Sequence, residues 1–151
     1  CPDLDDDAYA ERAGRVSAEC SARDVPLVVD RPAAVKGGIN AVGLHLDGAR
    51  LATCPARPLG HEYICLASVH NADELARAYA LEMDAAVLSP LRATASHPGQ
   101  AGLGNRAWQA MAHNAGLPVY ALGGIGPDDL DKVRALGGFG VAGITAYFPA
   151  V

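Results

Sequence analysis

The chain has 151 residues, half of them hydrophobic and 19% charged, a balance typical of one globular domain with a sizeable core. Its net charge is -5, and Lys and Arg form no cluster interleaved with aromatic residues, which argues against a nucleic-acid surface. No stretch approaches the roughly 20 consecutive apolar residues that a membrane helix needs. We therefore expect one domain over residues 1–151, with neither nucleic acid nor a membrane as its partner.

The cysteines and the start of the chain bear on the cellular compartment. Four cysteines are present, with no Cys-x-x-Cys pair and too few for a dense disulfide framework. No basic segment followed by an apolar one opens the chain as a leader would. These features predict a cytoplasmic protein and leave an oligomer open. The chain begins at Cys1 without an initiator methionine, as a piece of a longer protein would.

In chain order, a helix over residues 5–22 comes first. Aspartates stand at its start, and helical spacing predicts one apolar face made of Tyr9, Ala13, Val16 and Cys20. Six short apolar runs rich in valine and leucine follow, at 26–30, 42–46, 64–69, 85–89, 118–122 and 140–144. Each run is predicted to be a strand buried on both faces.

Helical patterns separate several of these runs. Residues 71–82 begin with Asn71 as a predicted N-cap and carry Glu74 three residues later, which is a capping-box arrangement. Residues 127–136 begin with a proline and two acids, as the first turn of a helix often does. Alternation of strand and helix predicts a parallel α/β sheet, either doubly wound or closed into a barrel. Periodicity alone does not choose between the two.

A pair of glycines, Gly123 and Gly124, ends the fifth apolar run just before the last predicted helix. Glycine lacks a Cβ atom, so it adopts positive φ and lets another group approach the backbone N–H groups closely. A strand that runs through glycines into a helix is a candidate anion cradle. The alternative interpretation is an ordinary tight turn.

Several side chains with catalytic potential follow other predicted strands. Asp30 closes the first run, where a carboxylate needs a partner, and the adjacent Arg31 is the simplest one. Ser68 and His70 stand at the end of the third run, although Ser68 could equally be an ordinary buried hydroxyl. His45 lies within an apolar run and is interpreted as a core or turn histidine. A long loop over 90–104 follows the fourth run, at the strand ends where α/β proteins bind ligands.

The segments GLHL, SVHNADEL, LSPLRATASHPG, PVYALGGIGPDDL and GVAGITAYF, in this order, resemble thiamine-phosphate synthase and the related thiazole tautomerase family. The resemblance covers about residues 25–148. It is closest to the synthase-like domain that some bacteria carry fused behind a Nudix (MutT-type) hydrolase domain. It implies a TIM-type (β/α) barrel of eight strands, the first two of which are absent from this chain, and so favours the barrel over the open sheet.

The resemblance also implies a reaction and its ligands. The family joins a pyrimidine pyrophosphate to a thiazole phosphate with Mg²⁺ and releases pyrophosphate. The expected ligand is therefore a small phosphate: thiazole phosphate, thiamine phosphate or pyrimidine pyrophosphate. The resemblance places thiazole phosphate on the backbone of five residues, namely Gly123, Gly124, Ile144, Thr145 and Ala146. It assigns pyrophosphate to a loop that carries Thr94, Ser96 and His97, and it makes Asp30, Ser68, His70 and His97 the catalytic candidates.

Three positions depart from the family pattern. Val29 replaces an asparagine beside the metal-binding Asp30, and Arg50 stands where a second carboxylate for Mg²⁺ is expected. His97 stands in place of a lysine that grips pyrophosphate. A guanidinium repels a cation, so these departures predict a weakened Mg²⁺ site and doubtful synthase chemistry. The hypotheses are an enzyme of thiamine metabolism, either synthase or thiazole tautomerase, and a non-catalytic ligand-binding or regulatory domain of a Nudix fusion.

Overall fold

The computed structural model describes residues 4–94 and 101–147. It contains one six-stranded sheet in the order β1-β2-β3-β4-β5-β6, and each neighbouring pair is parallel. All six strands fall within the predicted apolar runs, so this prediction is confirmed. Their bounds are β1 (Val28–Val29), β2 (Gly43–Leu46), β3 (Ile64–Val69), β4 (Ala85–Leu88), β5 (Val119–Ala121) and β6 (Gly140–Val141).

Helices precede the sheet and connect its strands. They are α1 (Asp6–Ala22), α2 (Pro32–Lys36), α3 (Gly48–Thr53), α4 (Ala72–Ala80), α5 (Gly104–His113), the 3-10 turn η1 (Pro127–Asp129) and α6 (Leu130–Ala135). The predicted α1, α4 and α6 are confirmed. The sequence did not predict α2 and α3, because 5 and 6 residues are too few to establish a helical period. Among the helices in the described part of the chain, none has the length and apolarity to cross a membrane.

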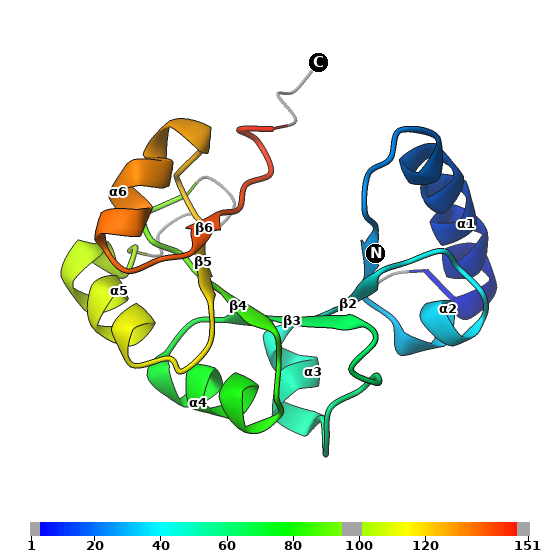
Figure 1. Ribbon diagram of the computed structural model, residues 1–151, viewed down its shortest axis with the longest axis horizontal. Helices are drawn as coiled ribbons and strands as arrows, with labels where there is room; N and C mark the ends of the chain where they lie inside the picture. Colours follow the sequence, from blue (N-terminus) through cyan, green and yellow to red (C-terminus); the bar gives the residue numbers. More distant parts are fainter. Residues whose placement is uncertain (1–3, 95–100, 148–151) are drawn as a thin grey trace.

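The strands curve into an arc, with α3, α4, α5 and α6 on its convex side and α1 and α2 at the β1 end (Figure 1). The α/β class and the parallel sheet agree with the predicted barrel type. The sheet itself is not closed, because β1 and β6 are its two edge strands and do not pair with each other. A barrel closes by pairing its first and last strands, and six short strands form only part of that circle.

The convex face of the sheet carries the core. Alternate residues of the strands point toward the helices, and those of β2, β3, β4 and β5 join one buried cluster. Trp108 of α5 is fully buried against this face, and its indole Nε1 donates a hydrogen bond to the carbonyl of Leu88, 3.2 Å away. Trp108 therefore belongs to the core. The concave face carries both apolar and polar residues, among them Val87, His45 and Ser68.

Helix α1 shows how local sequence sets a helix start. The side chain of Asp5 accepts a hydrogen bond from the Ala8 N–H at 2.8 Å, and two further aspartates occupy the first turn. The predicted apolar face is only partly correct: Tyr9 and Ala13 are buried, whereas Val16 is 44% exposed. Val16 lines a hollow beside the edge strand β1, where no further strand of the described chain covers it.

A charged clamp, formed by Arg57 and Asp84, holds the amino ends of β3 and β4 together. Arg57 is almost buried, and its guanidinium lies 2.6 Å from Asp84 Oδ2. The same oxygen accepts the Cys65 N–H at 2.6 Å, and Arg57 also donates to the carbonyls of Tyr63 and Glu82. Burial would raise the pKa of Asp84, but these hydrogen bonds outweigh it and lower the pKa. The clamp lies at the opposite strand ends from the candidate site, so we assign it to stability.

We expect Asp84→Asn to lower the free energy of unfolding by about 1–2 kcal/mol, because it leaves the nearly buried Arg57 without its counter-charge while Asp84 itself is partly screened by solvent. Urea denaturation measures the loss. Asp73→Asn, at an exposed position in the first turn of α4, is the matched control and should change stability by only a few tenths of a kcal/mol. Equal effects of the two substitutions would contradict the clamp.

Candidate functional site

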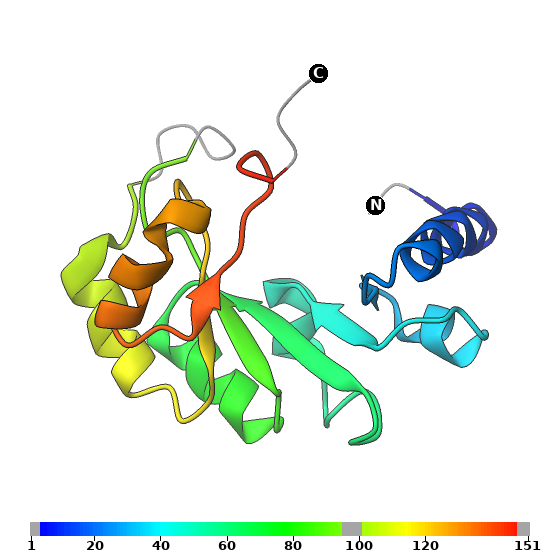
Figure 2. The same ribbon diagram turned by 45° about the horizontal axis from the view of Figure 1, so that its top comes forward.

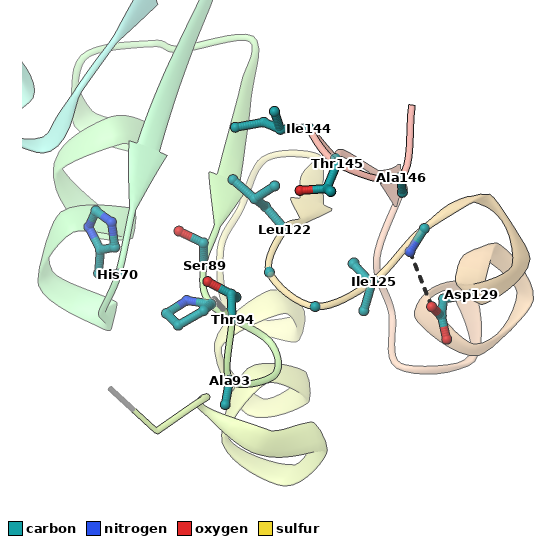
Figure 3. A pocket seen from close by; sticks show the side chains of 15 residues that line it. His70, Ser89, Ala93, Thr94, Leu122, Ile125, Asp129, Ile144, Thr145 and Ala146 are labelled. Carbon is teal, nitrogen blue, oxygen red and sulfur yellow. Dashed lines mark hydrogen bonds between the residues drawn. The ribbon is translucent and has the colours of Figure 1, made fainter. Parts of the chain in front are cut away.

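A hollow lies at the carboxyl ends of β4, β5 and β6. Figure 2 shows that the segments following these three strands leave the sheet on the same side. The cavity has a volume of about 560 Å³. Ser89 and Thr94 form one wall and Ile144 to Ala146 the opposite wall, with the segment from Leu122 to Ile125 between them (Figure 3). Parallel α/β sheets place their ligands at this edge.

The glycine pair shapes the floor of this cavity. Gly123 has φ +103° and Gly124 has φ +62°, a backbone region that other residues rarely adopt. A Cβ on Gly123 would lie 2.6 Å from Cβ of Pro90, and one on Gly124 would lie 2.9 Å from the carbonyl oxygen of Ala93. Both glycines are thus required by the turn and by its close contact with the loop after β4. The turn interpretation and the cradle hypothesis are compatible.

Unpaired backbone donors line the cavity. Among the described residues, the N–H groups of Gly123, Gly124 and Ile125 have no hydrogen-bond acceptor. The same is true, within that part of the chain, of the N–H groups over 144–146 on the opposite wall. The structure therefore brings together all five residues predicted to bind phosphate. Backbone N–H groups that lack a protein acceptor favour an anion.

The predicted pyrophosphate loop is only partly described. Thr94 lies in the cavity wall, as Figure 3 shows. Its Oγ1 atom is buried and finds no hydrogen-bond partner in the described part of the chain. A buried hydroxyl of this kind is available to a ligand. Ser96 and His97 lie outside the described residues, so their predicted roles stay predictions.

His70 stands at the end of β3 and also lines the cavity. Its ring Nδ1 lies 3.0 Å from Glu74 Oε2, which also accepts the His70 backbone N–H at 2.8 Å. The predicted cap is confirmed in part: Asn71 Oδ1 accepts the Glu74 N–H at 2.9 Å. The Glu74 carboxylate, however, reaches His70 and accepts the Asn71 side-chain amide at 2.9 Å, rather than the Asn71 backbone N–H. Glu74 thereby fixes the imidazole of a predicted catalytic residue.

Ser68 does not line the cavity and instead pairs with a histidine on the neighbouring strand. Its hydroxyl lies 2.7 Å from Nε2 of His45, with both side chains half-buried. Burial lowers the pKa of His45, although the nearby charges of Asp47 and Asp30 oppose this shift. The sequence interpretation of His45 as a core or turn residue missed this pairing. The strand register could have indicated it, since His45 pairs with Leu66, two residues before Ser68.

Asp30 does not stand alone at the end of β1. Arg50 Nη1 lies 3.8 Å from Asp30 Oδ2, and Arg50 Nε lies 3.9 Å from Asp47 Oδ2. Burial would raise the pKa of Asp30, but a hydrogen bond with Tyr9 and the charge of Arg50 contribute to lowering it. A guanidinium between two carboxylates does not fit the oxygen donor set that Mg²⁺ requires. Within residues 4–94 and 101–147, no three His, Cys, Asp or Glu side chains are grouped to hold a metal.

Comparison with protein families decides the relationship of this chain. The family model described as thiamine monophosphate synthase matches residues 1–147. The chain belongs to this family. Among curated proteins it is 31% identical to the thiamine-phosphate synthase of Thermosynechococcus vestitus over 147 residues, covering 97% of this chain and 42% of that protein. It is 30% identical to the thiamine-phosphate synthase of Vibrio campbellii, covering 92% of this chain and 69% of that protein.

The solved structures agree on the fold. A thiamine phosphate pyrophosphorylase from Pyrococcus furiosus superposes with a TM-score of 0.74 at 20% identity, covering 99% of this chain and 72% of that one. FabK from Thermotoga maritima reaches 0.72 at 15% identity, covering 99% of this chain and 50% of that one. Two proteins with such different names share the fold, so the fold does not specify the reaction. The predicted Nudix fusion stays a prediction.

We expect His45 to make the chain less stable as the pH falls. Its folded pKa lies below the usual value, so below about pH 6.5 the unfolded chain binds the proton more readily than the folded one. Wild-type unfolding free energy should therefore fall more between pH 7 and pH 5 than that of His45→Gln. Urea denaturation across this range measures the difference, with exposed His61→Gln as the control. A His45→Gln profile parallel to wild type would contradict a neutral, buried His45.

Proposed function

We propose that this thiamine-phosphate-synthase-like domain binds a phosphate monoester, thiazole phosphate or thiamine phosphate, in the cavity between the segments after β5 and β6. The observation that carries the proposal is the set of unpaired N–H groups on its two facing walls. The chain spans less than half the length of the Thermosynechococcus vestitus relative, 42% of it, so the activity of the whole protein is part of the proposal.

The dimensions and chemistry of the cavity support such a ligand. A volume of about 560 Å³ lies within the range of roughly 300–1,000 Å³ that holds small molecules. The terminal oxygens of a phosphate monoester accept hydrogen bonds from the N–H groups of Gly123 and Gly124 on one side and of Thr145 on the other. The apolar side chains of Leu122 and Ile125 face the rest of the molecule. Backbone donors of this kind need no particular side chain.

We propose further that Mg²⁺-dependent coupling is weak or lost. The coupling reaction needs a cation beside the departing pyrophosphate, and here the guanidinium of Arg50 occupies the space between Asp30 and Asp47. His97 replaces the lysine with which the family would hold pyrophosphate, and an imidazole is in general a weaker partner for an anion than an ammonium group. A domain of this kind binds its ligand without turnover, as a regulatory domain fused to a Nudix hydrolase would.

A second candidate function is a thiazole tautomerase. Isomerisation of a ring moves a proton between carbon atoms and needs acid and base groups rather than a metal. Two such groups are present: His45, whose pKa burial lowers, against Ser68, and the His70 ring held by Glu74. His70 lines the cavity, whereas His45 on β2 lines the hollow beside α1. The same phosphate cradle would hold the substrate.

We expect Gly124→Ala to weaken binding of thiazole phosphate at least about tenfold. The added methyl group strains a residue at φ +62° and presses on the carbonyl of Ala93, which displaces the cradle N–H groups. Isothermal titration calorimetry measures the affinity. Gly116→Ala is the matched control, since Gly116 also has positive φ, +70°, but contacts the ring of Tyr79 on α4, outside the cavity lining. Equal losses of thiazole phosphate affinity in the two variants would contradict the cradle proposal.

We expect little or no formation of thiamine phosphate from pyrimidine pyrophosphate and thiazole phosphate, with or without Mg²⁺. The reason is the charge of Arg50 at the expected metal position. The assay uses the full-length protein and follows product by chromatography, with an active thiamine-phosphate synthase as the positive control. Robust turnover that depends on Mg²⁺ would overturn the inactive-site proposal and leave phosphate binding intact.

A further inference from the structure

An ion pair joins the two loops that meet at the cavity. Arg92, in the loop after β4, places Nη2 2.9 Å from Oδ1 of Asp129 in η1, and its Nη1 donates to the carbonyl of Gly124 at 3.3 Å. Asp129 lines the cavity with 15% of its side chain exposed. The two residues are 37 positions apart in the sequence. Nothing in the sequence pattern connects them, and the acids at this helix start were predicted only as first-turn residues.

The carboxylate of Asp129 also accepts a hydrogen bond from one of the backbone N–H groups beside the glycine pair. Its Oδ2 accepts the Gly126 N–H at 3.2 Å, which Figure 3 shows as a dashed line. Gly123, Gly124 and Ile125 have no such acceptor in the described part of the chain. The loop after β5 therefore offers three N–H groups to a ligand, and its fourth is taken by the protein. The size of the anion site on this wall is limited by Asp129.

The same pair sets the charge of the site. Arg92 is the cation beside the cradle, but its guanidinium is engaged by Asp129 and by Gly124. Lys132 lies 3.7 Å from the same carboxylate oxygen of Asp129. The Asp129 carboxylate therefore offsets part of the positive charge of Arg92 and Lys132, and the attraction that an arriving anion loses in this way grows with the charge of the anion. A phosphate monoester carries about two negative charges at neutral pH, and a diphosphate carries more.

We propose that Asp129 is a specificity-determining residue that restricts this end of the cavity to a single phosphate group by neutralising Arg92, which weakens the attraction for anions of higher charge. This inference rests on the proposed phosphate cradle and adds which anion the cradle accepts. Removal of the negative charge would release the Arg92 guanidinium toward the ligand. The cavity would then favour the more highly charged anion.

The test compares inorganic phosphate with inorganic pyrophosphate, titrated by calorimetry against wild type and Asp129→Asn at fixed ionic strength. Asparagine keeps the size of the side chain and an oxygen for the Gly126 N–H but removes the charge. We expect the ratio of pyrophosphate to phosphate affinity to rise about tenfold or more in Asp129→Asn. Asp128→Asn, one position earlier and exposed, removes the same net charge and should leave the ratio unchanged within about twofold.

Two double variants locate the effect. The rise in the ratio of pyrophosphate to phosphate affinity caused by Asp129→Asn should disappear when Arg92→Gln is added, because the rise depends on the released guanidinium. It should also disappear when Gly124→Ala is added, because both anions bind at the cradle. An unchanged ratio in Asp129→Asn, or an equal rise in Asp128→Asn, would overturn this inference while leaving the cradle itself standing. If wild type and Asp129→Asn bind neither anion, both the cradle proposal and this inference fail.

Discussion

Parallel pairing of all six strands is the constraint on which the rest of the molecule depends. Because each strand runs the same way as its neighbours, every connection must cross back over one face, and the helices bury the apolar residues of that convex face. The carboxyl ends of the strands then gather along one edge. Residues as distant in sequence as Thr94, Gly123 and Thr145 come to line one cavity for this reason.

Close contact between two loops refines this edge into a site. Gly123 and Gly124 lack side chains where the loop from Pro90 to Ala93 passes within van der Waals distance, so the two segments pack backbone against backbone. Hydrogen bonds from the Leu91 N–H to Leu122 and from the Arg92 N–H to Gly123 hold them together. Within the described residues, the bonded carbonyls and the N–H groups without an acceptor are thus separated by only a few positions. This separation supports the anion that we propose as the ligand.

The sequence predicted those features that depend on short-range chemistry. Strands such as Ile64–Val69 were evident because buried parallel strands are continuous apolar runs. The Gly-Gly pair indicated where no side chain would cover the backbone. Features that depend on tertiary distance were not predictable. The contact of His45 with Ser68 follows from strand register, and that of Arg92 with Asp129 from the packing of two loops. The exposure of Val16 follows from the open edge of the sheet beside α1.

We propose that backbone N–H groups at the ends of β5 and β6 bind a phosphate monoester, and amide chemical shifts report such contacts residue by residue. The ¹⁵N-labelled chain is titrated with thiazole phosphate and followed by two-dimensional NMR. We expect saturable shifts at the amides of Gly123, Gly124, Ile125 and Thr145, and none at the Arg57 clamp. Shifts confined to other regions, or no shifts at millimolar ligand, would contradict it.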